Sequence, residues 1–364
     1  MVSGYASTGD GRHHGAHGAD AARALGGEPP GGFLDFSANI NPLGPPEAAL
    51  YAAQKALVGE VAAYPDGRYP ELCDALAGYL EVRGETVLPT NGGAEALFLA
   101  ARAAAGDRPG GRAVVLDPTF SEYAAAARAA GLVPESRVAR RREDGFRLDP
   151  SVLDDLGGVS VVFLCNPNNP TGDLTPRGEV LALLKRARSA GAALVVDEAF
   201  ADFAPGESVA GLVDDHLYVA RSFTKFFAVP GLRLGCLVAR DPERVRPFQP
   251  SWSVNVVAAA AGVAAAGDSG YAQRTLSEVA LRRGELCSAL DALPGLEVYA
   301  GSANFLLLRG PEGLPERLAR RGVLVRGCGP FPGLGPRFCR IAVRGAGENA
   351  RLVSAVEAAL EEAS

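Results

Sequence analysis

The middle of the chain alternates short apolar runs with longer alanine-rich stretches, and this alternation constrains the fold more than any other feature. Runs such as Val161–Leu164 are apolar at every position, as in strands that are buried on both faces. The stretches between them have the length and periodicity of amphipathic helices. The pattern predicts an α/β fold with a mostly parallel central sheet flanked by helices. Strands are expected at Ala113–Leu116, Ser160–Cys165, Ala193–Val196, Leu217–Ala220 and Leu234–Ala239, and helices at Ala94–Ala105, Glu122–Ala130 and Pro176–Ala190.

The 364 residues exceed a single ordinary core of about 150 residues, so more than one domain is expected. After Arg246 the pattern changes, because a proline-flanked segment, Pro247–Trp252, leads into longer helices and then short strands. We expect a smaller α+β domain there. The predicted parts are an N-terminal arm that joins the small domain (1–45), a large domain that holds the site (46–246), and a linking helix with the C-terminal small domain (247–364).

Charge and composition argue against several classes of partner. The net charge of −6 gives no electrostatic reason to expect a nucleic-acid partner, and the short arginine cluster at 140–142 is diluted by acidic neighbours. The longest apolar stretch, Val254–Gly267, is too short to span a bilayer and predicts a buried helix, so no membrane association is expected. The segment 1–18 lacks the apolar core of a secretory signal.

The six cysteines form no Cys-x-x-Cys pair and have no neighbouring histidine at the spacing of a zinc site. We therefore expect no metal ion and a reduced, cytoplasmic protein.

Lys225 is one of only three lysines in a chain that otherwise uses arginine for its basic residues. A lysine amine can attack a carbonyl and form a covalent imine, whereas a guanidinium has no free lone pair with which to do so. Lys55 and Lys185 lie in helical segments and are expected to face solvent. Lys225 instead follows a strand and has Ser222 three residues before it. It is the candidate nucleophile.

Polar or aromatic residues follow several of the expected strands, and ligands of open α/β sheets bind at the carboxyl ends of strands. Asp197 could pair with a protonated heterocyclic nitrogen, or it could simply cap the next turn. The amide of Asn169, in the irregular loop 166–172, could bond a phenolic oxygen, and Phe120 offers a flat face for ring stacking.

A candidate phosphate site lies at Asn91–Glu95, where two glycines open a helix and expose backbone N–H groups. Ser222 and Arg233 could add a hydroxyl and a guanidinium to the same anion. Taken alone, a glycine-rich turn that caps a helix would explain this segment equally well.

Together these motifs resemble the fold-type I pyridoxal-phosphate (PLP) enzymes of the aspartate aminotransferase superfamily. The resemblance rests on Asn-Pro-Asn-Asn-Pro-Thr-Gly at 166–172, Asp-Glu-Ala-Phe at 197–200 and Ser-x-x-Lys at 222–225 with an arginine eight residues on, and it runs from about residue 30 to the C-terminus. It implies pyridoxal 5'-phosphate as cofactor, covalently bonded to Lys225.

The resemblance also implies a role for each of the other candidates. Asp197 would pair with the pyridine nitrogen, Asn169 would bond the ring oxygen, and Phe120 would stack on the ring. The cofactor phosphate would be held by Gly93, Ala94, Ser222 and Arg233, joined by Tyr64 from a partner subunit, which implies a homodimer with shared active sites. Arg340 would bind the substrate carboxylate.

Two branches of the superfamily fit best, the threonine-phosphate decarboxylases of cobalamin biosynthesis and the histidinol-phosphate aminotransferases. Three segments resemble the decarboxylases: the opening segment 34–44, Phe200 where aminotransferases usually have tyrosine, and the segment 331–335. The first branch implies conversion of L-threonine O-3-phosphate to (R)-1-amino-2-propanol O-2-phosphate. The alternative is amino transfer between histidinol phosphate and 2-oxoglutarate.

A third possibility is a non-catalytic PLP-binding protein, which the presence of both Lys225 and Asp197 disfavours.

Both branches bind a phosphorylated substrate, so a second anion pocket is expected. Arg326 and His14 are the candidates for the substrate phosphate, and Asn39 in the opening segment is a further substrate-binding candidate. The arm at 13–18, His-His-Gly-Ala-His-Gly, departs from the usual His-Gly-Gly of the decarboxylases, so Ser7 and His17 stay open as weaker choices.

Overall fold

The computed structural model describes residues 32–106 and 110–362. The predictions made for Ser7, His14 and His17 lie outside these described residues.

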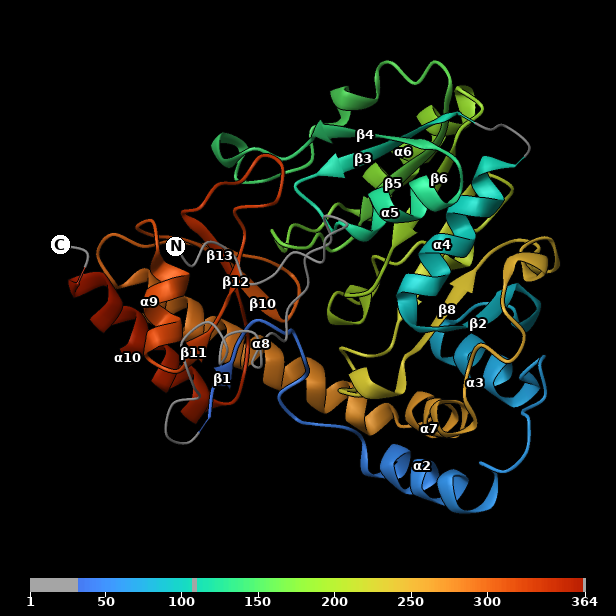
Figure 1. Ribbon diagram of the computed structural model, residues 1–364, viewed down its shortest axis with the longest axis horizontal. Helices are drawn as coiled ribbons and strands as arrows, with labels where there is room; N and C mark the ends of the chain where they lie inside the picture. The colour runs from blue at the N-terminus through green and yellow to red at the C-terminus, as the bar shows by residue number, and fades with distance from the viewer. Residues whose placement is uncertain (1–31, 107–109, 363–364) are drawn as a thin grey trace.

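The core of the larger body is a seven-stranded sheet in the order β2-β8-β7-β6-β5-β3-β4 (Figure 1). All its pairings are parallel except those of β8, which runs antiparallel to both of its neighbours. The prediction of a mostly parallel central sheet is confirmed. The strands are β2 (Val87–Asn91), β3 (Arg112–Asp117), β4 (Val133–Val138), β5 (Val159–Cys165), β6 (Ala193–Asp197), β7 (Leu217–Ser222) and β8 (Leu234–Val238).

Alternate residues of each central strand face opposite sides of the sheet, and helices cover both sides. On one side, Val115, Phe163 and Val195 pack with α4 (Gly92–Ala105) and α5 (Glu122–Ala129). On the other side, their neighbours in sequence pack with α6 and α7. The second layer consists of α2 (Glu47–Gly59), α3 (Pro70–Leu80), α6 (Arg177–Ser189) and α7 (Val256–Ala266). The apolar stretch around α7 is thus a helix packed against this core, and none of the described helices is long and apolar enough to cross a membrane.

A second body forms around a four-stranded antiparallel sheet in the order β12-β13-β10-β9. The 23-residue helix α8 (Ser269–Asp291) leads into it from α7 (Figure 1). Strand β1 (Leu34–Asp35) pairs with β11 (Val323–Leu324), so the segment before α2 joins this C-terminal body. The bounds proposed above for the three parts stay a prediction. The remaining elements are β9 (Glu297–Ala300), β10 (Phe305–Arg309), α9 (Leu314–Arg320), β12 (Arg326–Gly327), β13 (Phe338–Ala342) and α10 (Ala346–Glu361).

The two bodies meet at a close contact between two glycines. A Cβ atom on Gly172 would lie 2.9 Å from the Cα atom of Gly301, and a Cβ atom on Gly301 would collide with the backbone of Gly172. Ser302 N–H donates a 2.9 Å hydrogen bond to the carbonyl of Gly172. The loop after β5 therefore lies directly against the turn before β10.

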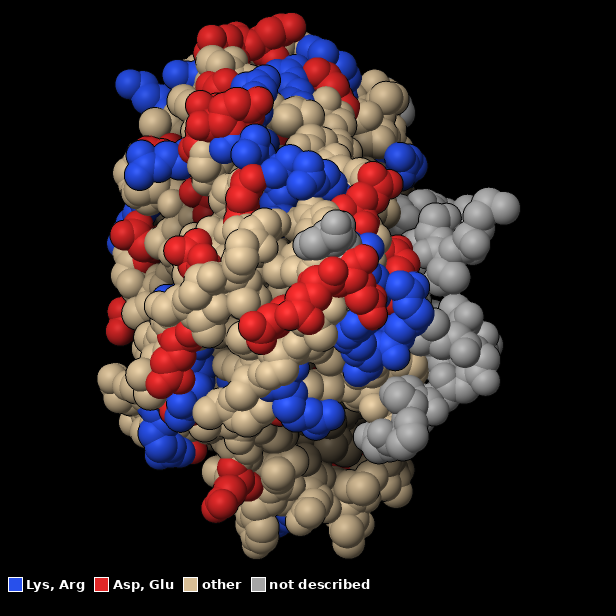
Figure 2. All heavy atoms as spheres, turned by 90° about the vertical axis from the view of Figure 1, so that its left-hand side faces the viewer, with Lys and Arg blue, Asp and Glu red and all other residues tan. Residues whose placement is uncertain are grey.

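Basic and acidic side chains are interspersed on the face of the molecule that Figure 2 shows. Among the described residues on that face, groups of basic and acidic side chains lie next to one another, in keeping with the modest net charge of −6.

Candidate active site

A cavity of about 490 Å³ lies at the carboxyl ends of β5, β6 and β7 and is closed on its far side by residues of the C-terminal body. This is where an open α/β sheet is expected to bind its ligand. The cavity brings together eleven of the residues predicted from the sequence, namely Asn39, Gly93, Ala94, Phe120, Asn169, Asp197, Ser222, Lys225, Arg233, Arg326 and Arg340.

Lys225 lies in this cavity, and its Nζ donates a 3.0 Å hydrogen bond to Ser222 Oγ. Withdrawal from water lowers the pKa of Lys225 to about 8, with Arg233 acting in the same direction and Asp197 opposing it. Only a neutral amine can attack a carbonyl, so this shift makes Lys225 a competent nucleophile near neutral pH.

Asp197 is buried at the end of β6, and both of its oxygens accept hydrogen bonds. Tyr123 Oη donates to Oδ2 at 2.7 Å, and the N–H of Ala199 donates to Oδ1 at 3.0 Å. Burial raises the pKa of Asp197, whereas the Tyr123 hydrogen bond and the nearby Lys225 lower it. The side chain is thus fixed in orientation and could pair with a cationic ring nitrogen.

The start of α4 forms a closely packed backbone cradle. A Cβ atom on Gly93 would lie 2.9 Å from Ser222 Cβ, and one on Gly92 would lie 2.7 Å from a terminal nitrogen of Arg233. Gly92 also has a positive φ of 78°, which favours glycine. Backbone N–H groups, a hydroxyl and a guanidinium therefore converge at one helix N-terminus, which suits a phosphate.

Arg340 of β13 contacts two other segments on the opposite side of the cavity, residues 37–39 and the loop after β5. It donates one hydrogen bond to Asn169 Oδ1 and another, at 2.7 Å, to the carbonyl of Ser37. Asn39 accepts a further one at 3.1 Å when its amide oxygen faces the guanidinium. Burial lowers the pKa of Arg340 to about 10, so it stays a cation at neutral pH. A buried cation of this kind suits a carboxylate or phosphate ligand.

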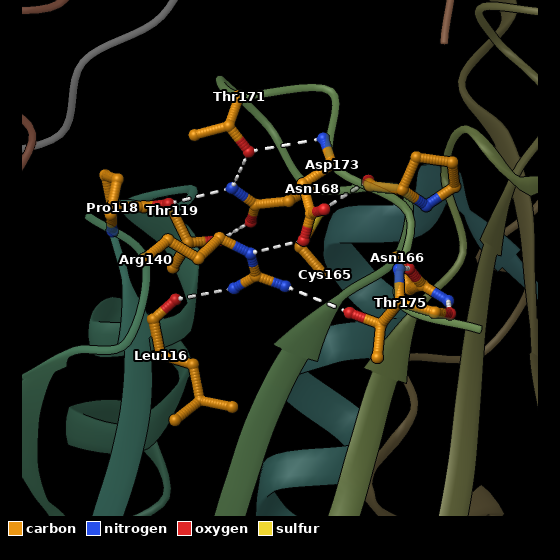
Figure 3. A network of polar contacts seen from close by, with 11 residues as sticks. Leu116, Pro118, Thr119, Arg140, Cys165, Asn166, Asn168, Thr171, Asp173 and Thr175 are labelled. Carbon is orange, nitrogen blue, oxygen red and sulfur yellow. Dashed lines mark hydrogen bonds and ion pairs between the residues drawn. The ribbon is translucent and has the colours of Figure 1, made fainter. Parts of the chain in front are cut away.

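A buried polar network holds the loop that carries Asn169 (Figure 3). Asn168 donates to the carbonyl of Pro118 at 2.9 Å and accepts from Thr119 Oγ1 at 3.0 Å. Arg140, which has no exposed surface, donates to Asp173 at 3.2 Å. These bonds join the loop after β5 to the segment after β3, so Asn169 and Phe120 are held relative to one another.

Aromatic side chains form part of the cavity wall. Phe120 contacts Tyr123 edge to face, with ring centroids 5.9 Å apart, and Tyr123 in turn stacks on Phe163. Phe200 is buried and packs edge-on against Phe305, with centroids 5.0 Å apart. The cavity is thus lined by the rings of Phe120, Phe200 and Phe331, and position 200 supplies no hydroxyl.

Tyr64 is the predicted site residue that the described part of this chain does not bring to the cavity. Its side chain is 79 % exposed and stacks on Trp252, with centroids 4.4 Å apart. Such a placement is compatible with the prediction that it serves a partner subunit.

Tyr123, Arg140 and Asn168 hold residues of the cavity in place but were not predicted from the sequence. Tyr123 lies in the first turn of α5, three residues after Phe120, and this short separation could have indicated that its side chain lies near the site. Arg140 carried no signal of burial, because it belongs to a run of three arginines that looks solvated.

The chain belongs to the aminotransferase class I and II family, whose model matches residues 32–358. The chain is accordingly a PLP-dependent enzyme, and the residues of the cavity fit that cofactor: a lysine with a lowered pKa, a fixed carboxylate, a ring face and a phosphate cradle.

Among individual relatives, the chain is 40 % identical to the threonine-phosphate decarboxylase of Salmonella typhimurium, over 94 % of this chain and 95 % of the relative. It is 34 % identical to histidinol-phosphate aminotransferase 1 of Cupriavidus pinatubonensis, over 91 % of this chain and 89 % of that protein. The crystal structure of L-threonine-O-3-phosphate decarboxylase from Porphyromonas gingivalis matches with a TM-score of 0.77 and 26 % identity, over 90 % of this chain and 99 % of that one.

Proposed function

We propose that the protein decarboxylates L-threonine O-3-phosphate to (R)-1-amino-2-propanol O-2-phosphate, as a step of cobalamin biosynthesis. The observation that carries the proposal is the 40 % identity to the Salmonella decarboxylase along nearly the whole of both chains. Phe200 supports it, because the cavity has no tyrosine hydroxyl there to bond the cofactor oxygen, in contrast to the pattern expected of aminotransferases.

Pyridoxal phosphate, when bound, supplies an electron sink for the pair left at Cα when a bond to that atom breaks. Lys225 would hold the cofactor covalently, Asp197 would face the ring nitrogen, and Asn169 would face the ring oxygen. Phe120 would cover one ring face. Gly93, Ala94, Ser222 and Arg233 would hold the cofactor phosphate.

Lys225 would also return a proton to Cα after the carboxylate has left. Its Nζ donates a 3.0 Å hydrogen bond to Ser222 Oγ, which holds the amine inside the cavity. A pKa of about 8 lets the same nitrogen carry a proton at neutral pH and release it without a large barrier.

The substrate carries a carboxylate and a phosphate, and the cavity has two arginines beyond the one at the phosphate cradle. We assign the carboxylate to Arg340, with Asn39 beside it, and the substrate phosphate to Arg326, which lies over the ring of Phe331 at 5.8 Å. His14, in the part of the chain that is not described, remains the second candidate for the phosphate.

Decarboxylation requires that the bond from Cα to the carboxylate stand perpendicular to the cofactor ring, since only that bond then overlaps the π system. Arg340 stabilises the charged carboxylate and by itself opposes loss of neutral carbon dioxide. Its hydrogen bonds to Ser37 and Asn169 fix its position, so its catalytic value would lie in setting this orientation.

Paired assays on the purified holoenzyme test the proposal. Carbon dioxide release from L-threonine O-3-phosphate, with no 2-oxo acid requirement, is the expected result. The matched Lys225→Ala variant should release none. Amino transfer from histidinol phosphate to 2-oxoglutarate, without carbon dioxide from threonine phosphate, would assign the protein to the aminotransferase branch. This branch is the second candidate because the chain is 34 % identical to the Cupriavidus aminotransferase.

We also propose that the protein is a homodimer with shared active sites. The outer face of α2 and the segment after it expose Tyr51, Val58 and Tyr64, and Trp252 lies beside Tyr64. Large apolar side chains gathered in this way are typical of a covered surface. If two copies meet at this surface, Tyr64 of each copy would reach the cofactor phosphate bound by the other copy.

A cytoplasmic location is proposed on the cysteines. All six are free thiols, and four of them are buried. Unpaired buried thiols suit a reducing compartment.

A further inference from the structure

We propose that Tyr123 is a positioning residue for the cofactor, acting through the carboxylate of Asp197. The proposal concerns the cofactor end of the cavity. The role of Tyr123 does not depend on which substrate the enzyme uses, so it can be tested independently of the decarboxylase proposal.

Tyr123 reaches Asp197 from a different element of the fold. It lies in the first turn of α5, whereas Asp197 ends β6, and the 2.7 Å hydrogen bond from Tyr123 Oη to Asp197 Oδ2 joins the two. Tyr123 has no exposed surface, so water cannot replace this donor. Its ring stacks on Phe163, with ring centroids 5.5 Å apart, and also contacts Phe120 edge to face. The phenol therefore has little freedom to leave the carboxylate.

The short segment 120–123 thus serves two functions. Phe120, just before α5, would contribute the ring face, and Tyr123, three residues later, anchors the carboxylate that would face the ring nitrogen. The edge-to-face contact between their rings couples the two placements. A shift of α5 would change both the stacking face and the charge partner.

The hydrogen bond also affects where a proton resides. Burial favours the neutral form of Asp197, and the Tyr123 hydroxyl stabilises the ionised form against it. Without this donor the carboxyl would tend to take the proton for itself and leave the ring nitrogen uncharged. A less positive ring withdraws fewer electrons from the nitrogen of Lys225, which then holds its own proton to higher pH.

The test is Tyr123→Phe in the holoenzyme, with two readouts. The first is the pH midpoint of the change in the cofactor's visible absorbance, which reports the proton on the Lys225 nitrogen. The second is kcat. The groups that bear on this nitrogen are Asp197, Arg233, Cys165 and Arg340, and the substitution leaves all four in place. We expect the midpoint to rise and kcat to fall about tenfold or more, the effect of losing one hydrogen bond to a buried charge.

Tyr79→Phe is the matched control. Tyr79 Oη donates a 2.9 Å hydrogen bond to Asp202, so the substitution removes the same kind of Tyr–Asp bond outside the cofactor cavity. It should lower stability, leave the pH midpoint of the absorbance change where it is in the natural protein, and keep kcat within about twofold. Equal effects of the two substitutions on the midpoint would overturn the proposal, since they would show a general loss of packing.

A double variant keeps the test decisive if Tyr123→Phe is less stable than the natural protein. In an Asp197→Asn background, Tyr123 has no carboxylate through which to act, so adding Tyr123→Phe should move neither readout further. A full additional loss in that background would show that Tyr123 acts by another route, and an unchanged midpoint in the single variant would equally refute the proposal.

Discussion

Arg340 of β13 donates a hydrogen bond to the side chain of Asn169, which follows β5 in the other sheet. The bond joins the proposed substrate-binding guanidinium to the amide proposed to face the cofactor. The two bodies of the molecule therefore share one polar contact inside the cavity. Movement of the C-terminal body would act on substrate and cofactor together.

Arg340→Ala should lower kcat/KM for the substrate by about 30-fold or more, since removing one partner of a buried charged contact costs about 2 kcal/mol or more. Arg340→Lys should recover part of this loss, because it restores the charge without the planar fork. Steady-state kinetics measures both. Arg344→Ala is the control, since Arg344 lies on the same segment, pairs with Glu348 and does not line the cavity. A similar loss in that variant would argue against a direct role for Arg340.

The lowered pKa of Lys225 predicts the pH dependence of cofactor binding by the apoenzyme. The amine attacks only when neutral, and its neutral fraction rises with pH through a pKa of about 8. Stopped-flow absorbance should therefore show a rate that increases with pH and levels off above about 8, well below the usual lysine value near 10.4. Asp197 raises this pKa, so Asp197→Asn should move the midpoint downward. A midpoint near 10.4 would contradict the expected burial of the amine.

Gly301→Ala should disturb both stability and activity. The new methyl group would collide with the backbone of Gly172 and push away the loop that carries Asn169. Overpacking of this kind costs about 1–3 kcal/mol, and thermal unfolding should show it. Gly284→Ala is the control: it lies within α8 with open space around it, so the same change should stabilise the helix slightly. Equal changes in thermal stability and activity in the two variants would show that the close contact between Gly301 and Gly172 is not important.

A mixture of two inactive variants tests the shared active site. Lys225→Ala lacks the nucleophile and Tyr64→Ala lacks the residue proposed to cross the interface. After unfolding and refolding together, heterodimers should contain one site with both residues intact. Activity approaching a quarter of that of the natural protein is expected from random pairing, because half of the dimers then have one good site of two. No recovery, with mixed dimers demonstrated by mass spectrometry, would place Tyr64 outside its partner's site.

Much of the fold followed from simple periodicity. The five predicted strands match β3, β5, β6, β7 and β8 to within two residues at each end, because strands buried on both faces have continuous apolar runs. Strand β4 was not predicted because it lies at the sheet edge, contains Pro134 and has polar residues at three of its six positions. Edge strands need only one buried face, so their sequences carry a weaker signal.

Residues of the cavity were predictable where the chemistry demands one residue type. Lysine at 225 and aspartate at 197 have few substitutes, so their types alone point to a role. Tyr123 and Arg140 act by holding other residues, and many side chains could do so from many positions. Their contribution depends on contacts between elements far apart in sequence, such as α5 with β6, and only the folded structure reveals these.

The most direct measurement is the isotopic composition of the product formed from L-threonine O-3-phosphate in deuterated water. We expect carbon dioxide and 1-amino-2-propanol O-2-phosphate with one solvent deuterium at C1, where a solvent-derived hydron replaces the lost carboxylate. Appearance of a 2-oxo acid, or exchange of the Cα hydrogen without loss of carbon dioxide, would contradict it.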